Sequence, residues 1–121
     1  MLILGLVIAG VIGAPVRYLV DGLVLDRTES GLPLGTVFIN ITGSLLLGGL
    51  TGLALYHAFP STPKTILGTG FCGAYTTFST FTYETIRLAE DGEMRAALRV
   101  LLASLVIPAV AAALGLALAA L

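Results

Sequence analysis

The sequence predicts an all-α membrane protein with four transmembrane helices and a break in the third. The composition, four long apolar stretches, and a group of glycines and hydroxyls inside the third stretch support this prediction. Of the 121 residues, 57% are hydrophobic and only 11% are charged, and the mean hydropathy is +1.03. Because a soluble domain usually carries about 25% charged residues, the composition argues against a soluble fold. The length leaves no room for a second domain.

The composition also excludes several functional classes. The formal net charge is −1 and the basic residues do not cluster, so we expect no nucleic-acid partner. A single cysteine, Cys72, rules out an internal disulfide. The first apolar stretch lacks a basic segment before it and is long enough to span, so we interpret it as a retained helix. We expect no enzymatic activity.

Four stretches provide the roughly 20 mostly apolar residues that a spanning helix needs. They cover approximately residues 2–20, 34–56, 65–88 and 97–120. The connections are short, which predicts an up-down-up-down bundle that forms one domain over residues 1–121. Four helices of this size make a poor conduit alone, so we expect an oligomer. Small residues that let helices approach closely in lipid recur at intervals of four: Gly5, Ala9, Gly13, Gly48, Gly52, Ala111, Gly115 and Ala119.

The charges favour one orientation in the membrane without settling it. Arg27 and Arg95 lie in connections on one side, and Lys64 lies on the other. Positive residues favour the cytoplasm, which favours outward-facing termini. The bias is stronger only if three further arginines reach the surface, namely Arg17, Arg87 and Arg99. If these arginines are buried, insertion in both directions remains open.

The third span is predicted to be irregular. Its glycines weaken a helix, and its hydroxyls compete for backbone hydrogen bonds. A break near Gly73–Thr76 would leave carbonyl oxygens without partners, which is costly in hydrocarbon unless a cation or a donor meets them. Carbonyl clusters hold alkali cations without charged ligands. The alternative is a glycine kink whose hydroxyls bond back to their own helix, and the spacing leaves both open.

Aromatic and polar residues follow the expected break. Phe78 and Phe81 are three residues apart and therefore neighbours on one helical face, with Thr77, Thr80 and Glu84 on the adjacent face. Because the edge of a phenyl ring is positive, two rings presented edge-on can stabilise a small anion in a dry site. The alternative is a pair of core phenylalanines, which periodicity alone favours.

Two further polar residues lie deep in the apolar spans. Asn40 offers two amide donors and no charge to an anion, or it joins neighbouring helices. Ser104 is the only polar side chain after Arg99, and Pro108 leaves its carbonyl without a helical donor. This serine either caps a neighbouring group or lines a path.

Two charged residues lie near the ends of their spans. Arg17 either extends to the interface or gives an anion vestibule a positive potential. Glu84 is interpreted as a hydrogen-bond partner of nearby threonines. We expect no functional role for His57 or Cys72.

Three stretches of this sequence resemble the signatures of the Fluc/CrcB family of fluoride channels. The stretches are GAPVRY at 13–18, GTVFINITGS at 35–44 and GFCGAYTTFSTF at 70–81. The similarity covers the whole chain in length and number of spans, and the last span matches only through Ser104. Tyr75 stands where a smaller aliphatic residue is expected.

The resemblance implies a dimer of four-helix subunits inserted antiparallel to each other, with dual topology and two fluoride pathways along the interface. Its partner is a second copy or a paired homologue. A structural sodium ion is implied at the dimer centre, bound by the backbone carbonyls of Gly73 and Thr76. The implied anion pathway comprises Arg17, Asn40, Phe78, Thr80, Phe81, Glu84 and Ser104.

The resemblance thus implies a fluoride-selective channel in the cell membrane, or in the inner membrane if the source has two. It would passively export cytoplasmic fluoride and reduce its toxicity, and sodium would not be transported. The alternative is a small proton-coupled multidrug or cation transporter, which needs a membrane-embedded carboxylate. The first span offers Arg17 and no acid, and Glu84 comes late in the third.

Overall fold

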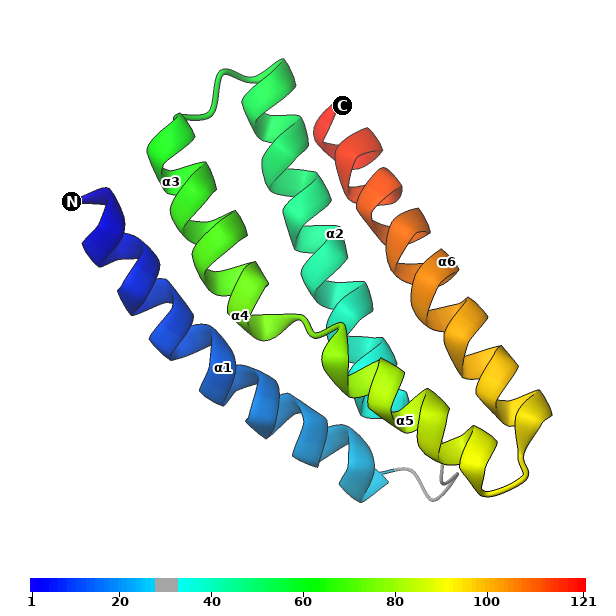
Figure 1. Ribbon diagram of the computed structural model, residues 1–121. Helices are drawn as coiled ribbons and strands as arrows, with labels where there is room; N and C mark the ends of the chain where they lie inside the picture. The colour runs from blue at the N-terminus through cyan, green and yellow to red at the C-terminus, as the bar shows by residue number, and fades with distance from the viewer. Residues whose placement is uncertain (28–32) are drawn as a thin grey trace.

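The computed structural model describes residues 1–27 and 33–121, and every element in them is helical (Figure 1). Three long helices run along the bundle: α1 (Leu2–Arg27), α2 (Leu34–Tyr56) and α6 (Met94–Ala119). Each contains a segment long and apolar enough to cross a bilayer. With a bent fourth crossing between α2 and α6, the chain is a multi-pass membrane protein.

The bounds of two long helices differ from the expected spans. Helix α1 continues to Arg27 instead of ending near Val20, and α6 begins at Met94 instead of Ala97. Hydropathy locates the part of a helix that sits in hydrocarbon, whereas hydrogen bonding extends the helix into the polar interface. Pro15 and Pro108 lie inside α1 and α6, and both helices continue through them.

The third crossing consists of short helical pieces in series. Helix α3 (Ser61–Thr65) leads into the π-helix η1 (Ile66–Cys72) and then into α4 (Gly73–Tyr75), and α5 (Ser79–Glu90) follows an interruption. Thr76 is extended, with φ −78° and ψ 161°. The predicted break is therefore present. Gly73 itself is helical, with φ −62° and ψ −36°, so the break lies just after the glycines, at residues 76–78.

Helices α2 and α6 pack side by side (Figure 1), with glycines at their closest approach. A methyl group on Gly48 would collide with the carbonyl oxygen of Ala112, and one on Gly115 would collide with that of Leu45. At the end of the pair, Gly52 faces Leu116 and Ala119. The prediction that these small residues mark close helix contacts is confirmed.

The two halves of the broken crossing pack on different neighbours. The η1 and α4 pieces lie against α1, where a methyl group on Gly13 would be 2.6 Å from the Phe71 carbonyl oxygen. The α5 piece lies mainly against α6 (Figure 1). The break therefore lets one crossing change partner midway through the bundle.

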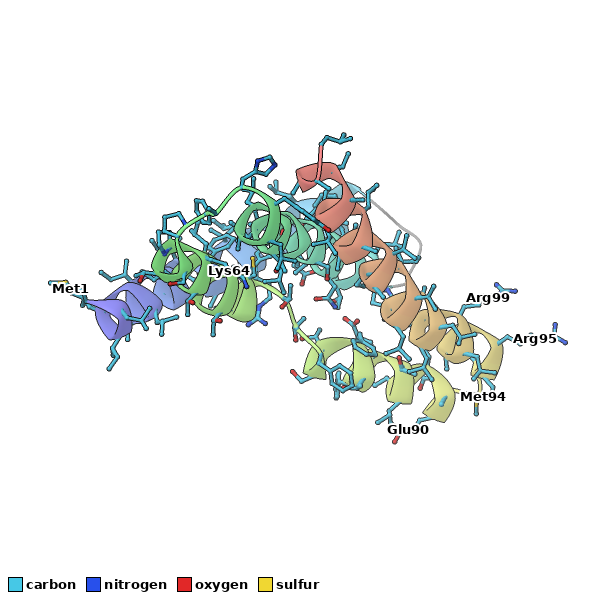
Figure 2. The ribbon with its side chains drawn as sticks, turned by 90° about the horizontal axis from the view of Figure 1, so that it is seen from above. Met1, Lys64, Glu90, Met94, Arg95 and Arg99 are labelled. Carbon is cyan, nitrogen blue, oxygen red and sulfur yellow. The ribbon has the colours of Figure 1, made fainter. Side chains whose placement is uncertain are left out.

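Most charged residues gather at one end of the bundle. Arg95, Arg99 and Glu90 lie near the connection between α5 and α6, far from Lys64 (Figure 2). Arg87, Arg95 and Arg99 are exposed, whereas Arg17 is half-buried. Two of the three arginines whose exposure was open are thus exposed on the single subunit, as a stronger charge bias would require.

Candidate functional site

The break at residues 76–78 is held by the side chain of Asn40. The Asn40 Nδ2 donates to the Thr77 carbonyl oxygen at 2.8 Å, and Oδ1 accepts from the Thr77 amide at 2.8 Å. Asn40 is buried, with 6% of its surface exposed. One amide side chain thus satisfies both backbone groups of a residue that has left the helix. Of the two donors predicted for an anion, one is committed to Thr77, and one N–H remains.

Because Asn40 pairs with the Thr77 amide, a backbone carbonyl oxygen before the break loses its helical hydrogen-bond donor. In a continuous helix the Thr77 amide would donate to the Gly73 carbonyl, but it donates to Asn40 instead. Gly73 is exposed, and no heavy atom outside its own helix would lie within 4 Å of a methyl group placed on it. Gly73 therefore lies on an open face of the subunit, and its carbonyl lacks the helical donor.

Arg17 reaches the same break from α1. Its Nη1 donates to the Thr76 carbonyl oxygen at 3.4 Å, beyond the usual N–H···O range of about 2.7–3.2 Å. The Thr76 amide and hydroxyl both bond to the Cys72 carbonyl, at 2.9 and 2.8 Å. Arg17 therefore brings a positive charge to the break, near the middle of the crossing.

Thr77 also begins the helix that follows. Its Oγ1 accepts from the Thr80 amide at 3.2 Å and shares a 2.9 Å hydrogen bond with the Thr80 hydroxyl. This side chain therefore satisfies one of the free amides at the start of α5, as an N-cap residue does.

Phe78 and Phe81 are neighbours, as predicted, but their exposure differs. The ring centroids lie 4.7 Å apart at an interplanar angle of 78°, an edge-to-face arrangement. Phe81 is buried, with 2% of its surface exposed, whereas 68% of the Phe78 surface is exposed. In the single subunit, Phe81 is a core residue and Phe78 is available to a partner or an ion.

Two buried oxygens lie on the helices beyond the break. Thr36 donates through Oγ1 to Glu84 Oε1 at 3.5 Å, while Glu84 Oε2 is buried and has no hydrogen-bond partner among residues 1–27 and 33–121. Ser104 is 5% exposed, and its Oγ is likewise unpartnered within that described part of the chain. The expected threonine partner of Glu84 thus comes from α2 rather than from its own helix.

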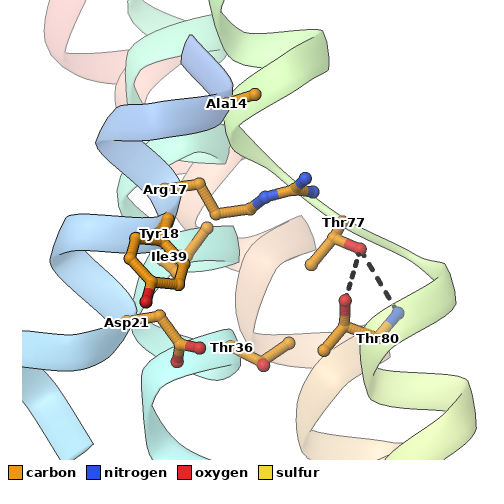
Figure 3. Close-up of a pocket in the computed structure, with 8 residues that line it drawn as sticks. All are labelled: Ala14, Arg17, Tyr18, Asp21, Thr36, Ile39, Thr77 and Thr80. Carbon is orange, nitrogen blue, oxygen red and sulfur yellow. Dashed lines mark hydrogen bonds between the residues drawn. The ribbon is translucent and has the colours of Figure 1, made fainter.

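A polar cavity of about 190 Å³ borders the break (Figure 3). It lies between α1, α2 and the start of α5, with the Arg17 side chain extending across it towards Thr77. Its lining residues are Ala14, Arg17, Tyr18, Asp21, Thr36, Ile39, Thr77 and Thr80. Thr36 and Asp21 were not predicted. Thr36 lies four residues before Asn40, and this helical spacing was the available signal.

The predicted residues therefore fall into two groups. The structure brings Arg17, Asn40 and Thr80 together around the break and its cavity. Glu84 and Ser104 do not line this cavity, and Phe78 points away from the core of the subunit.

Comparisons with known proteins identify the family. The family described as "CrcB-like protein, Camphor Resistance (CrcB)" matches residues 4–116. "Fluoride-specific ion channel FluC 1" of Leifsonia xyli subsp. xyli is 50% identical over 98 residues, covering 81% of this chain and 72% of the relative. "Fluoride-specific ion channel FluC 2" of Mycobacterium tuberculosis strain H37Rv is 47% identical, covering 93% of this chain and 86% of the relative. A FluC 1 of Frankia casuarinae is 48% identical, covering 94% and 93% respectively. This chain belongs to the CrcB family.

Proposed function

We propose that this protein is a subunit of a fluoride-selective channel that passively exports fluoride from the cytoplasm. The observation that carries the proposal is the break at residues 76–78, where Asn40 and Arg17 place N–H donors at mid-crossing beside a polar cavity. The names of the FluC relatives supply the identity of the ion.

The groups around the break suit a small anion. The remaining N–H of Asn40, the hydroxyls of Thr77 and Thr80 and the exposed Phe78 ring offer weak donors and a positive ring edge. Arg17 adds a positive potential from one side. A site of this kind replaces the water around fluoride without trapping the ion. In this pathway Glu84 and Ser104, with their unpartnered oxygens, take positions further along α5 and α6.

The open face of the break supports pairing with a second subunit. Gly73 and Phe78 are exposed near the middle of the crossing, and irregular backbone at that depth must be covered by protein or line a water-filled path. We propose an antiparallel partner of the same fold. That partner is a second copy of this chain inserted in the opposite orientation, and the exposed Arg87, Arg95 and Arg99 at one end make a paired homologue of fixed orientation the alternative.

The backbone at the break also fits a structural sodium ion. The Gly73 carbonyl lacks its helical donor and belongs to an exposed residue, and within the described part of the chain the Thr76 carbonyl accepts only a long contact from Arg17. Carbonyl oxygens are suitable ligands for an alkali cation. The residues that would hold sodium are thus Gly73 and Thr76, and the ion would supply a fixed positive charge that joins subunits and is not transported.

The physiological role follows from acid–base chemistry. Hydrogen fluoride crosses membranes as a neutral acid and ionises in the less acidic cytoplasm, which traps fluoride there. A channel that admits only the anion lets the negative-inside potential drive it outward, by about 2.3 kcal/mol per charge at 100 mV.

Passive efflux from liposomes that contain only this purified chain tests the proposal. We expect a fluoride electrode to record efflux, chloride to be retained, and efflux to fail when sodium is removed from both sides. Efflux that requires an added homologue would show that the channel is a pair of different subunits and not a homodimer. Efflux indifferent to sodium would remove the metal role of Gly73 and Thr76. Proton-driven uptake of an organic cation without fluoride efflux would establish the transporter alternative.

A further inference from the structure

Tyr75 occupies a defined position immediately before the break. It is the last residue of α4, and only 7% of its surface is exposed. Its ring stacks on Phe71, with centroids 5.6 Å apart and an interplanar angle of 12°. On the α2 side, a methyl group on Gly43 would lie 3.1 Å from Tyr75 Cδ1. Thr76 Cγ2 would lie closer still to that methyl group, so Gly43 makes room both for Thr76 and for the Tyr75 ring beside it.

The Tyr75 hydroxyl shares a hydrogen bond with α2. Its oxygen lies 2.8 Å from Thr42 Oγ1, which also lies 3.0 Å from the Phe38 carbonyl and 3.1 Å from the Ile39 carbonyl. A threonine hydroxyl has one proton and carbonyls can only accept, so these contacts are all satisfied together when Thr42 donates to its own helix and Tyr75 donates to Thr42.

Helix α2 thus holds the chain on both sides of Thr76. Asn40 binds the backbone of Thr77 after it, and Thr42 binds the Tyr75 hydroxyl before it. Thr76 is the extended residue at which the chain leaves the helix, and Phe78 follows two positions later. With both flanking residues fixed, the direction in which Phe78 leaves the break is also fixed.

We propose that Tyr75 is a positioning residue for the ion pathway, acting through its hydroxyl bond to Thr42 to set the orientation of Phe78. This inference rests on the proposed fluoride channel. It gives a role to the residue at which this sequence departs from the pattern expected for the family.

The test measures the unitary fluoride current in planar bilayers for Tyr75→Phe, Thr42→Val and the double variant. A change in the number of folded channels alters how often channels appear, whereas repositioning Phe78 alters the amplitude of each channel. Loss of one hydrogen bond is expected to lower the amplitude about three- to tenfold in each single variant. Because both changes remove the same bond, the double variant should be no lower than the more impaired single one.

Thr51→Val is the matched control. Thr51 is also half-buried on α2, and its Oγ1 bonds to the Leu47 carbonyl of its own helix at 2.9 Å. It repeats the loss of an intrahelical threonine bond without touching the break, so its unitary current should stay within about twofold of wild type. Unchanged amplitudes in Tyr75→Phe and Thr42→Val, or an equal loss in Thr51→Val, would overturn the proposal.

Hydrogen exchange at the Thr77 amide provides a second measurement that needs no ion flux. The exchange rate should increase in Tyr75→Phe and Thr42→Val but not in Thr51→Val, because only the first two loosen the break. If wild-type protein carries no fluoride, the channel assignment fails, while the exchange data still show whether Tyr75 fixes the break. If flux is present and exchange is unchanged, the positioning role fails alone. If Tyr75→Phe does not assemble, both measurements are made on Thr42→Val, which keeps the Tyr75 ring and removes the same hydrogen bond.

Discussion

Helix α6 and the broken crossing differ in continuity, and the position of proline does not explain the difference. Helix α6 contains Pro108 in its interior and continues from Met94 to Ala119. The broken crossing has no proline near its interruption, yet the helix stops at Tyr75 and restarts at Ser79. A proline removes one backbone hydrogen bond, and the close packing of α2 on α6 supports the helix through that loss.

The interruption is maintained instead by side chains that replace backbone hydrogen bonds. Asn40 bonds to both backbone polar groups of Thr77, and the Thr77 hydroxyl accepts from the Thr80 amide, one of the free amides at the start of α5. Close glycine contacts make the α2–α6 pair rigid. In the broken crossing, side-chain hydrogen bonds replace backbone ones and place the groups that we propose contact the ion. Changes in the first region should therefore reduce folding, and changes in the second should reduce flux.

The largest effect is expected from replacing both Phe78 and Phe81 with isoleucine. Isoleucine keeps the apolar character but removes the positive ring edges, so fluoride efflux should fall at least about 100-fold, equivalent to about 2.7 kcal/mol in the barrier. The measurement is electrode-recorded efflux from liposomes, normalised to assembled protein by size-exclusion chromatography.

The single variant Phe78→Ile separates the loss of a ring edge from damage to the subunit core. The Phe78 ring is 68% exposed, so Phe78→Ile alone creates no core cavity and should still lower efflux about tenfold. Phe59→Ile, in the connection between α2 and α3, should leave efflux at the wild-type rate. Efflux that persists in the double variant would show that the ring edges play no part.

The sequence was sufficient to predict the break but not its position. Glycines and hydroxyls between Gly68 and Thr82 weaken a helix wherever they occur, so irregularity followed from local chemistry. The position depends on the pairing of Asn40 with Thr77, which are 37 residues apart, and no local pattern encodes this. Gly73 was accordingly placed in the break although it is helical.

The candidate site was predictable to a similar degree. The contact between Phe78 and Phe81 followed from helical spacing. Their unequal exposure did not, because burial of Phe81 depends on how α5 turns after the break. The bond from Thr36 to Glu84 was also missed, since the two residues meet only when α5 returns beside α2.

A smaller effect, on stability rather than flux, should follow from Gly48→Ala. The added methyl group would collide with the Ala112 carbonyl where α2 and α6 approach, and overpacking of this kind costs about 1–3 kcal/mol. Thermal unfolding in detergent should show a lower midpoint. Gly49→Ala on the same helix is the control, because its nearest contact would be the Gly115 carbonyl at 4.0 Å. Equal stability of the two variants would contradict the assignment of this pair as the rigid part.

The smallest effect on backbone stability is expected from Thr77→Val, which acts on the start of α5. Valine keeps the shape but removes the hydroxyl that accepts from the Thr80 amide, and loss of an N-cap acceptor costs about 1 kcal/mol. Hydrogen exchange of the Thr80 amide should therefore accelerate about fivefold, and backbone pairing of Thr77 with Asn40 should persist. Thr82→Val is the comparison, since Thr82 Oγ1 bonds to carbonyls of its own helical turn, those of Phe78 and Ser79. If both variants accelerate exchange equally, the hydroxyl of Thr77 is an ordinary helix-surface group, and the restart of the helix depends on Asn40 alone.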